Sequence, residues 1–381
     1  MISMVVVAGV TAAMIIILSA FNGIEDLVSG LFSSFDADIT ISATEGKTIK
    51  IDALDYLSIA KTEGVEMMSE VIEEDVWINY GEQNTVATIK GVSPSYGEMS
   101  TLDTMMYLGE FVLKQNNLNY SIIGRGIRGE LGIRFREGES PIINIHAPKR
   151  GKKIRSSKQG AFNTLPIMVG GVYSVNAELD VKYVIAPVAY CKELFGYDDE
   201  ISALEVDVSK EADVEEVSKS LQILLGDQFL IRTRYQKNLL IYQTNASEKW
   251  ATFLILLFIL IIAAFNIVAS LTMLIIEKKK DIFILQSMGV TRPTINSIFI
   301  LESIFIYFIG AMIGIILGVG LCFLQQSFGL IRLEGAMIPY YPVSVEWNDV
   351  FQVILSVMAV GFAFSLILVR YLIKRYVSLG A

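Results

Sequence analysis

The chain has 381 residues, of which 53% are hydrophobic, and its mean hydropathy is +0.52. This is too apolar for an ordinary soluble protein. Its formal net charge is −9, and no nucleic-acid partner is expected.

Four apolar runs are long enough to cross a bilayer as helices, because a spanning helix needs about 20 residues. The sequence therefore predicts an α-helical membrane protein with four transmembrane helices. The predicted transmembrane helices are residues 1–21, 250–276, 295–324 and 350–369.

The first apolar run, residues 1–21, has no Lys or Arg before it, which is unusual for a membrane helix. It also lacks the basic region and the cleavage site of a signal peptide, so we expect the true start of the chain to lie upstream. From Phe21 to Phe35 the apolar residues recur in steps of three or one, which is a helical spacing. The first helix is therefore expected to continue beyond the membrane, either as a stalk or packed against its own domain.

Residues 22–249 have the composition of a globular domain and are numerous enough to bury a core. Alternating and helical apolar spacings predict a strand-helix-strand unit at each end of this interval, and hence an α+β domain inserted between helices 1 and 2. The predicted elements are a strand at 38–42, a helix at 51–62, a hairpin of 76–80 with 85–92, a strand at 203–208, a helix at 212–225 and a strand at 229–232.

Residues 124–129 match the pattern G-x-G-x-x-G, which occurs in dinucleotide-binding folds. That fold also needs an acidic residue about 20 positions further on, where Asn144 and Ile145 stand here. We therefore interpret these glycines as structural.

Residues 148–158 form a basic segment in an otherwise acidic domain. Two interpretations stay open: a solvated hairpin tip, or a loop that binds a partner, because clustered charge steers association. The candidate partner-binding residues are Lys149, Arg150, Lys152, Lys153 and Arg155.

Basic residues near the spans set the predicted orientation, because cytoplasmic loops of membrane proteins are enriched in Lys and Arg. They cluster in residues 277–294 and in the tail 370–381, whereas the loop 325–349 contains only Arg332. The first two segments are therefore predicted to be cytoplasmic, and the loop 325–349 and the domain at 22–249 extracytoplasmic.

Residues 277–294 are predicted to form a short cytoplasmic helix between the second and third spans. Its predicted apolar side is Ile282, Leu285 and Met288, Gly289 is expected to end it, and Thr291 to cap the helix that follows. A helix in this position is suited to be moved by a partner. The candidate coupling residues are Lys280, Ile282, Leu285, Met288 and Gly289.

In the third span, Gly310, Gly314 and Gly318 recur every four residues and predict a face on which another helix approaches closely. Glu302 lies within the same span. An acidic residue there suggests either function or packing, and we favour packing.

The sequence contains no catalytic constellation: a Walker A motif, a nucleophile elbow and zinc-ligand spacing are all missing. We therefore expect no enzyme activity, no cofactor and no metal. The single His146 is interpreted as structural, and Cys191 and Cys322 are not expected to form a disulfide.

The segment around the short helix resembles the lipoprotein-releasing (Lol-type) permeases of the FtsX/MacB-like superfamily of ABC transporters. The resemblance rests on the run AAFNI at 263–267, the charged exit at 277–278 and the run ILQSMGVT at 284–291. It implies a cytoplasmic ATPase that docks on residues 278–291. It also implies a dimer of permease subunits, either homomeric or heteromeric.

The same resemblance implies that lipoprotein substrates are taken from the inner membrane and passed to a periplasmic carrier, which the basic loop would recruit. It places the acyl chains between the outer ends of the first two spans, where the residues are apolar as acyl chains require. The candidate cavity residues are Leu18, Phe21, Ile24, Phe253, Leu257 and Leu260. Finally, it implies that the two ends of the domain form one subdomain and that residues from about 95 to 200 form a second, β-rich one.

Two alternatives stay open. One is a MacB-like or FtsX-like permease that moves another substrate or regulates a cell-wall hydrolase. The other is a receptor with an outer ligand-binding domain and no ATPase. Dependence of a co-purifying ATPase on residues 278–291 would exclude the receptor, and bound triacylated lipoprotein would separate the two kinds of permease.

Overall fold

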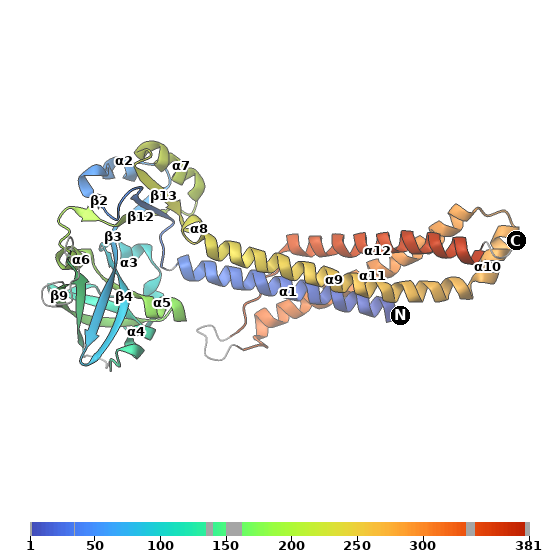
Figure 1. Cartoon of the computed structure of the whole chain (residues 1–381), viewed down its shortest axis with the longest axis horizontal. Helices are drawn as coiled ribbons and strands as arrows, with labels where there is room; N and C mark the ends of the chain where they lie inside the picture. The colour runs from blue at the N-terminus through green and yellow to red at the C-terminus, as the bar shows by residue number, and fades with distance from the viewer. Residues whose placement is uncertain (1, 34, 135–139, 150–161, 333–339, 378–381) are drawn as a thin grey trace. The chain divides into compact units, whose positions relative to one another are not determined.

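The computed structural model describes residues 2–33, 35–134, 140–149, 162–332 and 340–377. The chain divides into two compact units (Figure 1). The helical unit comprises Met1–Val28 and Leu240–Ala381, and the domain comprises Ser29–Leu239.

Four helices of the described chain are long and apolar enough to cross a membrane. A shorter helix, α10 (Lys279–Ser287), lies between two of them in the sequence. The four long helices are α1 (Ile2–Ser33), α9 (Leu239–Glu277), α11 (Arg292–Phe328) and α12 (Trp347–Val377). Each extends beyond its predicted span, because helical hydrogen bonding continues where the chain becomes polar. The prediction that the first helix continues past residue 21 is confirmed as far as Ser33.

Helices α1 and α11 approach each other closely through the three glycines of the third span. A Cβ atom on Gly314 would lie 2.6 Å from the carbonyl oxygen of Ala8, and one on Gly318 would lie 3.0 Å from Ile15. Gly310 meets Val7 in the same way. A larger side chain at any of the three would force the two helices apart, so the predicted small-residue face is the contact with α1.

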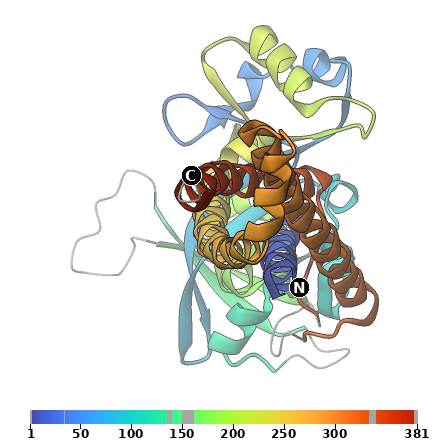
Figure 2. The ribbon, with the colours of Figure 1, turned by 90° about the vertical axis from the view of Figure 1, so that its right-hand side faces the viewer.

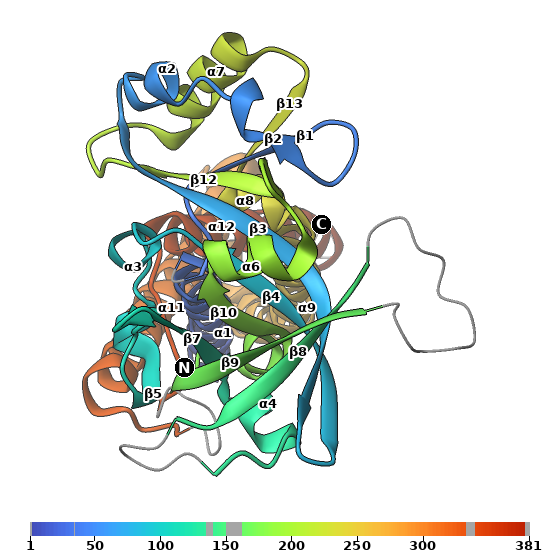
Figure 3. The same cartoon turned by 90° about the vertical axis from the view of Figure 1, so that its left-hand side faces the viewer.

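The domain is built on an eleven-stranded sheet in its described residues, in the order β13-β1-β12-β3-β4-β10-β7-β9-β5, with β6 paired to β7 and β8 paired to β3 and β9 (Figure 3). A separate pair is formed by β2 (Ile49–Lys50) and β11 (Glu200–Ile201). The strands of the main sheet are β1 (Ile39–Ala43), β3 (Val65–Tyr80), β4 (Gln83–Val92), β5 (Met106–Gly109), β6 (Lys114–Gln115), β7 (Leu118–Gly124), β8 (Ile142–Pro148), β9 (Phe162–Tyr173), β10 (Tyr183–Pro187), β12 (Ala203–Val208) and β13 (Phe229–Thr233).

Helices cover the sheet in two groups. At one end, α2 (Tyr56–Ala60) and α7 (Val214–Leu225) lie together, and α7 packs on β13 (Figure 3). At the other end, α6 (Val188–Phe195) packs on β3 and β4. The remaining helices of the domain are η1 (Ile51–Ala53), α3 (Tyr96–Met99), η2 (Leu102–Met105), α4 (Arg125–Glu130), α5 (Ala177–Lys182) and α8 (Arg234–Lys237).

The two ends of the domain form one subdomain, as predicted. Strand β1 pairs with both β12 and β13, and their apolar residues share a core with α7. The second core differs from the expectation that it begins near residue 95, because Ile72, Val76 and Ile89 of the hairpin already belong to it. The reason is the length of β3, whose 16 residues extend about 50 Å and reach both cores.

The predicted helix at 51–62 is broken in two. Residues 51–53 form a single 3₁₀ turn, and α2 begins only after Asp55. The Asp55 carboxylate accepts a hydrogen bond from the Ser58 amide at 3.1 Å, which is the geometry of an N-cap. Capping at Asp55 starts a new helix there, which a periodicity of apolar residues does not reveal.

Candidate functional site

The helix α10 is held by well-defined ends. Gly289 has a positive φ of 89°, a conformation that suits glycine, and follows the last turn of the helix. The Val290 amide donates to the Leu285 carbonyl at 3.0 Å. Thr291 then stands at the N-cap of α11, with Pro293 in its first turn. The short turn between α10 and α11 fixes the direction of α10. Figure 2 views the helical unit from the end at which α10 lies.

One side of α10 is buried against the other helices. Ile282 is only 3% exposed and packs with Ile275, Ile295, Phe299 and Val369. Leu285 is half-buried. The predicted apolar side comprises Ile282, Leu285 and Met288, and within it Ile282 packs against its own chain while Met288 is exposed.

The opposite side of α10 carries three exposed apolar side chains: Phe283 (59% exposed), Ile284 (57%) and Met288 (76%). Together with Lys280 they follow a second helical stripe, with steps of three, one and four residues. Of the predicted coupling residues, Lys280, Met288 and Gly289 are exposed. Phe283 and Ile284 were not among the predicted coupling residues, although the spacing of this second stripe could have pointed to them.

A polar cluster, here called the outer triad, joins three of the long helices. The Asn22 amide donates to Asp349 at 2.7 Å, and the Lys249 ammonium donates to the Asn22 side-chain oxygen at 2.7 Å and pairs with Asp349 at 3.0 Å. Asn22 is fully buried although it lies on α1 next to an apolar span. The triad therefore holds α1, α9 and α12 at one level, close to Trp250 and Trp347, which suit a membrane interface.

A pocket of about 280 Å³ lies beside the outer triad. Its lining combines the charged Glu25, Lys249 and Asp349 with the apolar Leu18, Trp250 and Phe253. Such a lining can accept a molecule with a polar group and an apolar group side by side.

The residues predicted to hold acyl chains fall into two groups. Leu18 (2% exposed), Phe253 (7%) and Leu260 (0%) lie in the packed interior of the helices. Phe21, Ile24 and Leu257 are half-buried. The more exposed apolar residues of this part of α9 are Leu254, Ile255, Phe258 and Ile262.

The basic loop lies almost wholly outside the described residues. Lys149 directly follows β8, and the loop connects β8 to β9. Arg150, Lys152, Lys153 and Arg155 are not described, so the loop stays a prediction.

Two interpretations of single motifs are supported by contacts. A Cβ atom on Gly124 or Gly126 would overlap Asp180 or Val181, so these glycines allow α4 and α5 to pack closely. The Nδ1 atom of His146 lies 2.7 Å from the Thr164 hydroxyl, and its ring lies 5.9 Å from Trp77, as expected of a structural histidine. Cys191 and Cys322 are both free and buried.

A second polar cluster, the junction cluster, lies where the chain enters and leaves the domain. Lys90 is fully buried, pairs with the buried Glu205 at 2.9 Å and donates to the Phe35 carbonyl at 2.8 Å. Asp36 pairs with Lys237 at 2.7 Å, and Asp38 pairs with Arg234 at 2.8 Å. The junction cluster comprises Asp36, Asp38, Lys90, Glu205, Arg234 and Lys237.

The opposite charges of the junction cluster stabilise each other's ionised forms. Burial acts to lower the pKa of Lys90, but the Glu205 and Asp36 carboxylates outweigh it and hold that pKa above its ordinary value. The rings of Phe35 and Tyr96 also face the ammonium group, with centroids 5.2 and 4.8 Å away. Residues 35–38 and 234–237 are thereby fixed to the centre of the sheet. Sequence reasoning missed this cluster, since its members are far apart in the chain.

Two family models match the chain. The MacB-like periplasmic core domain matches residues 1–224, and the FtsX-like permease C-terminal model matches residues 253–377. The chain belongs to the family of FtsX-like permeases with a MacB-like periplasmic core domain. It is accordingly a membrane protein with an extracytoplasmic domain.

Individual relatives cover nearly the whole chain. The lipoprotein-releasing system transmembrane protein LolE of Haemophilus influenzae is 22% identical over 93% of this chain and 87% of its own length. LolC of Neisseria meningitidis serogroup B is 24% identical over 95% of this chain and 89% of its own. The macrolide export ATP-binding/permease protein MacB of Bdellovibrio bacteriovorus is 24% identical over 78% of this chain and 48% of its own.

Proposed function

We propose that the chain is the permease subunit of an ABC transporter that extracts lipoproteins from the cell inner membrane and passes them to a periplasmic carrier. A separate cytoplasmic ATPase subunit supplies the energy, and the permease itself catalyses no reaction. The similarity to LolE and LolC along 93% and 95% of the chain is the observation that carries this proposal.

The ATPase docks on the exposed side of α10, opposite to Ile282. Phe283 and Ile284 on this nine-residue helix and Met288 directly after it are exposed apolar side chains, which favour a partner with an apolar groove. The buried side, through Ile282, connects α10 to α9, α11 and α12. Movement of the docked partner is therefore passed directly to three membrane helices.

The lipid part of the substrate lies near the outer ends of α1 and α9. The half-buried Phe21, Ile24 and Leu257 and the exposed apolar residues of α9 offer a surface for acyl chains, and a second permease subunit encloses it. The pocket beside the outer triad adds charged groups next to this surface, suited to the polar start of a lipoprotein. Leu18, Phe253 and Leu260 pack beneath this surface, in the interior of the helical unit.

Co-purification of the ATPase tests the docking step. Phe283→Asp places a charge at the centre of the proposed interface and should weaken ATPase binding by roughly 30-fold or more, the cost of losing an interface hot spot. Ile223→Asp is the matched control, because Ile223 is an 85% exposed apolar residue on α7 of the domain. Full recovery of the ATPase with Phe283→Asp would show that α10 is not the docking element.

A MacB-like permease for another substrate is the second candidate, and the similarity to the macrolide exporter MacB favours it. Mass spectrometry of the purified complex separates the two. Bound triacylated lipoprotein supports the first proposal, and a bound drug or peptide without lipoprotein supports the second.

A further inference from the structure

Several charged residues of the central strands lie on one face of the domain sheet, here called its polar side, which also carries the apolar Val71 and Val92. On β12, Leu204 and Val206 face the core while Glu205 faces away from it. Strand pairing sets Glu205 and Arg232 on either side of Thr40, and sets Glu73 directly opposite Lys90. Residues paired in this way share a face, so four charged groups gather on the polar side of the sheet.

Two further charged groups, Asp36 and Lys237, lie near these four. The carboxylates of Asp36, Glu73 and Glu205 lie close enough to act on the ammonium groups of Lys90 and Lys237. With Arg232 included, three formal negative charges face three positive ones, and both lysines already have carboxylate partners at 2.9 and 2.7 Å. Lys90 and Lys237 are therefore already paired with Glu205 and Asp36, and neither forms an ion pair with Glu73.

One carboxylate oxygen in the cluster has no hydrogen-bond partner. Glu205 is 1% exposed, and while one of its oxygens bonds Lys90, the other accepts from no group in the described chain. A buried carboxylate oxygen without a donor is unfavourable, because it has lost its water partners and gained none in the protein. Glu73 accepts the Tyr183 hydroxyl at 2.8 Å on one oxygen, which leaves its other oxygen for a further donor.

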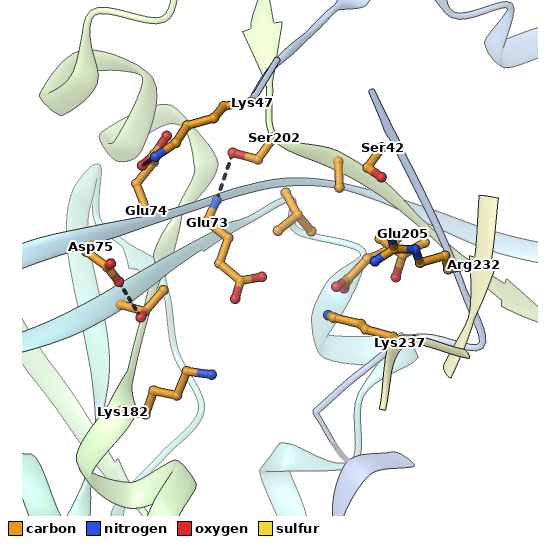
Figure 4. A pocket seen from close by; sticks show the side chains of 14 residues that line it. Ser42, Lys47, Glu73, Glu74, Asp75, Lys182, Ser202, Glu205, Arg232 and Lys237 are labelled. Atoms are coloured by element: carbon orange, nitrogen blue, oxygen red, sulfur yellow. Dashed lines mark hydrogen bonds and ion pairs between the residues drawn. The ribbon is translucent and has the colours of Figure 1, made fainter. Parts of the chain in front are cut away.

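Both glutamates line a cavity of about 470 Å³ (Figure 4). Glu73, Lys182 and Lys237 extend toward the same space in this view. Arg232 and Lys182 line the cavity too, and both are exposed. The ammonium group of Lys182 lies over the Tyr183 ring, 4.7 Å from its centroid. The site therefore has acceptors in its centre and positive charge beside them.

We propose that this cavity binds a zwitterion, with a primary ammonium group on Glu205 and Glu73 and an anionic phosphate or carboxylate on Arg232 and Lys182. An ammonium group supplies up to three N–H donors, which matches the free oxygens of the two glutamates. A metal ion fits less well, since no group of three or more metal-ligating side chains exists among the described residues. This site is independent of the proposed function of the permease.

Two sources share this chemistry: the headgroup of an ethanolamine phospholipid, and a free amino acid or short peptide. The test uses the full-length protein in nanodiscs of phosphatidylcholine and phosphatidylglycerol, which contain no primary ammonium lipid. Calorimetric titrations with O-phosphoethanolamine and with glycylglycine then distinguish a headgroup from a peptide. Phosphocholine is the matched control ligand, because it keeps both charges but has no N–H donor.

We expect one or both probes to bind with a dissociation constant on the order of 1 mM or tighter, and phosphocholine at least about tenfold more weakly. Glu73→Gln and Arg232→Gln should each weaken binding by about tenfold, while Glu82→Gln, at the exposed hairpin turn, should not. Glu73 and Arg232 are chosen because neither belongs to a buried ion pair, so both variants should fold. The proposal is overturned if neither probe binds at about 10 mM, if phosphocholine binds equally well, or if both variants bind like the parent.

Discussion

The outer triad and the junction cluster both join segments that are far apart in the sequence, but they differ in burial. In the junction cluster, Lys90 and Glu205 are 0% and 1% exposed. In the outer triad, the side chains of Lys249 and Asp349 retain 22% and 12% exposure. A broken ion pair costs most where water cannot replace the lost partner, so the two clusters should respond very differently to the same kind of substitution.

The largest effect is expected for Lys90→Met. This variant leaves Glu205 buried without a cation and should destabilise the domain by about 3–5 kcal/mol. Hydrogen exchange of the β12 amides in the full-length protein measures the loss. The double variant Lys90→Met with Glu205→Leu removes both charges and should recover most of the stability. If the single and double variants were equally unstable, packing rather than charge would explain the effect.

A smaller effect is expected for Lys249→Met in the outer triad. Asn22 and Asp349 keep their own hydrogen bond of 2.7 Å, and partial exposure lets water replace the lost ammonium group. We expect a loss of about 1 kcal/mol, seen as a modest decrease of the thermal unfolding midpoint in detergent. A loss as large as that of Lys90→Met would mean that the two clusters do not differ as their burial suggests.

Stability should also depend on pH through Asp207, which neighbours Asp38 of the junction cluster. Burial and the neighbouring Asp38 carboxyl raise the pKa of Asp207 from its ordinary 3.8 to about 7. Between these values the folded state binds more protons than the unfolded state, so stability should fall as the pH rises from about 4 to about 7. Asp207→Asn should reduce this dependence, as measured by the hydrogen exchange of β12 at several pH values. An unchanged pH profile in the variant would assign the dependence to other groups.

The smallest effect is expected for Lys47→Gln. Its ion pair with Glu74 spans 3.3 Å, but the Lys47 side chain is 80% exposed. Exposed pairs contribute at most about 1 kcal/mol, so domain stability should be nearly unchanged. A clear loss of hydrogen-exchange protection in β3 would show that the Lys47–Glu74 pair stabilises the domain more than an exposed ion pair should.

The difference between the two clusters also marks what the sequence could predict. Strong local patterns gave the four apolar helices, the β12–α7–β13 unit and the hairpin of β3 with β4. The pairing of Lys90 with Glu205 could not be predicted, because it depends on which strands become neighbours.

Which side of α10 is buried was also predicted only in part, but for a different reason. Its sequence contains two helical apolar stripes, one through Ile282 and one through Phe283. Only tertiary packing against Ile275 and Phe299 decides which stripe is buried. In the same way, burial of Leu18 and Leu260 follows from four helices packing together, which no single span reveals.

The proposal that the chain releases lipoproteins is tested most directly by a transfer assay. The permease and its co-purifying ATPase are reconstituted in proteoliposomes with a triacylated lipoprotein, and a soluble periplasmic carrier is added outside. We expect ATP to move the lipoprotein to the carrier, with Phe283→Asp abolishing transfer and Ile223→Asp preserving it. ATP hydrolysis by the intact complex without any lipoprotein reaching the carrier would contradict the proposed function.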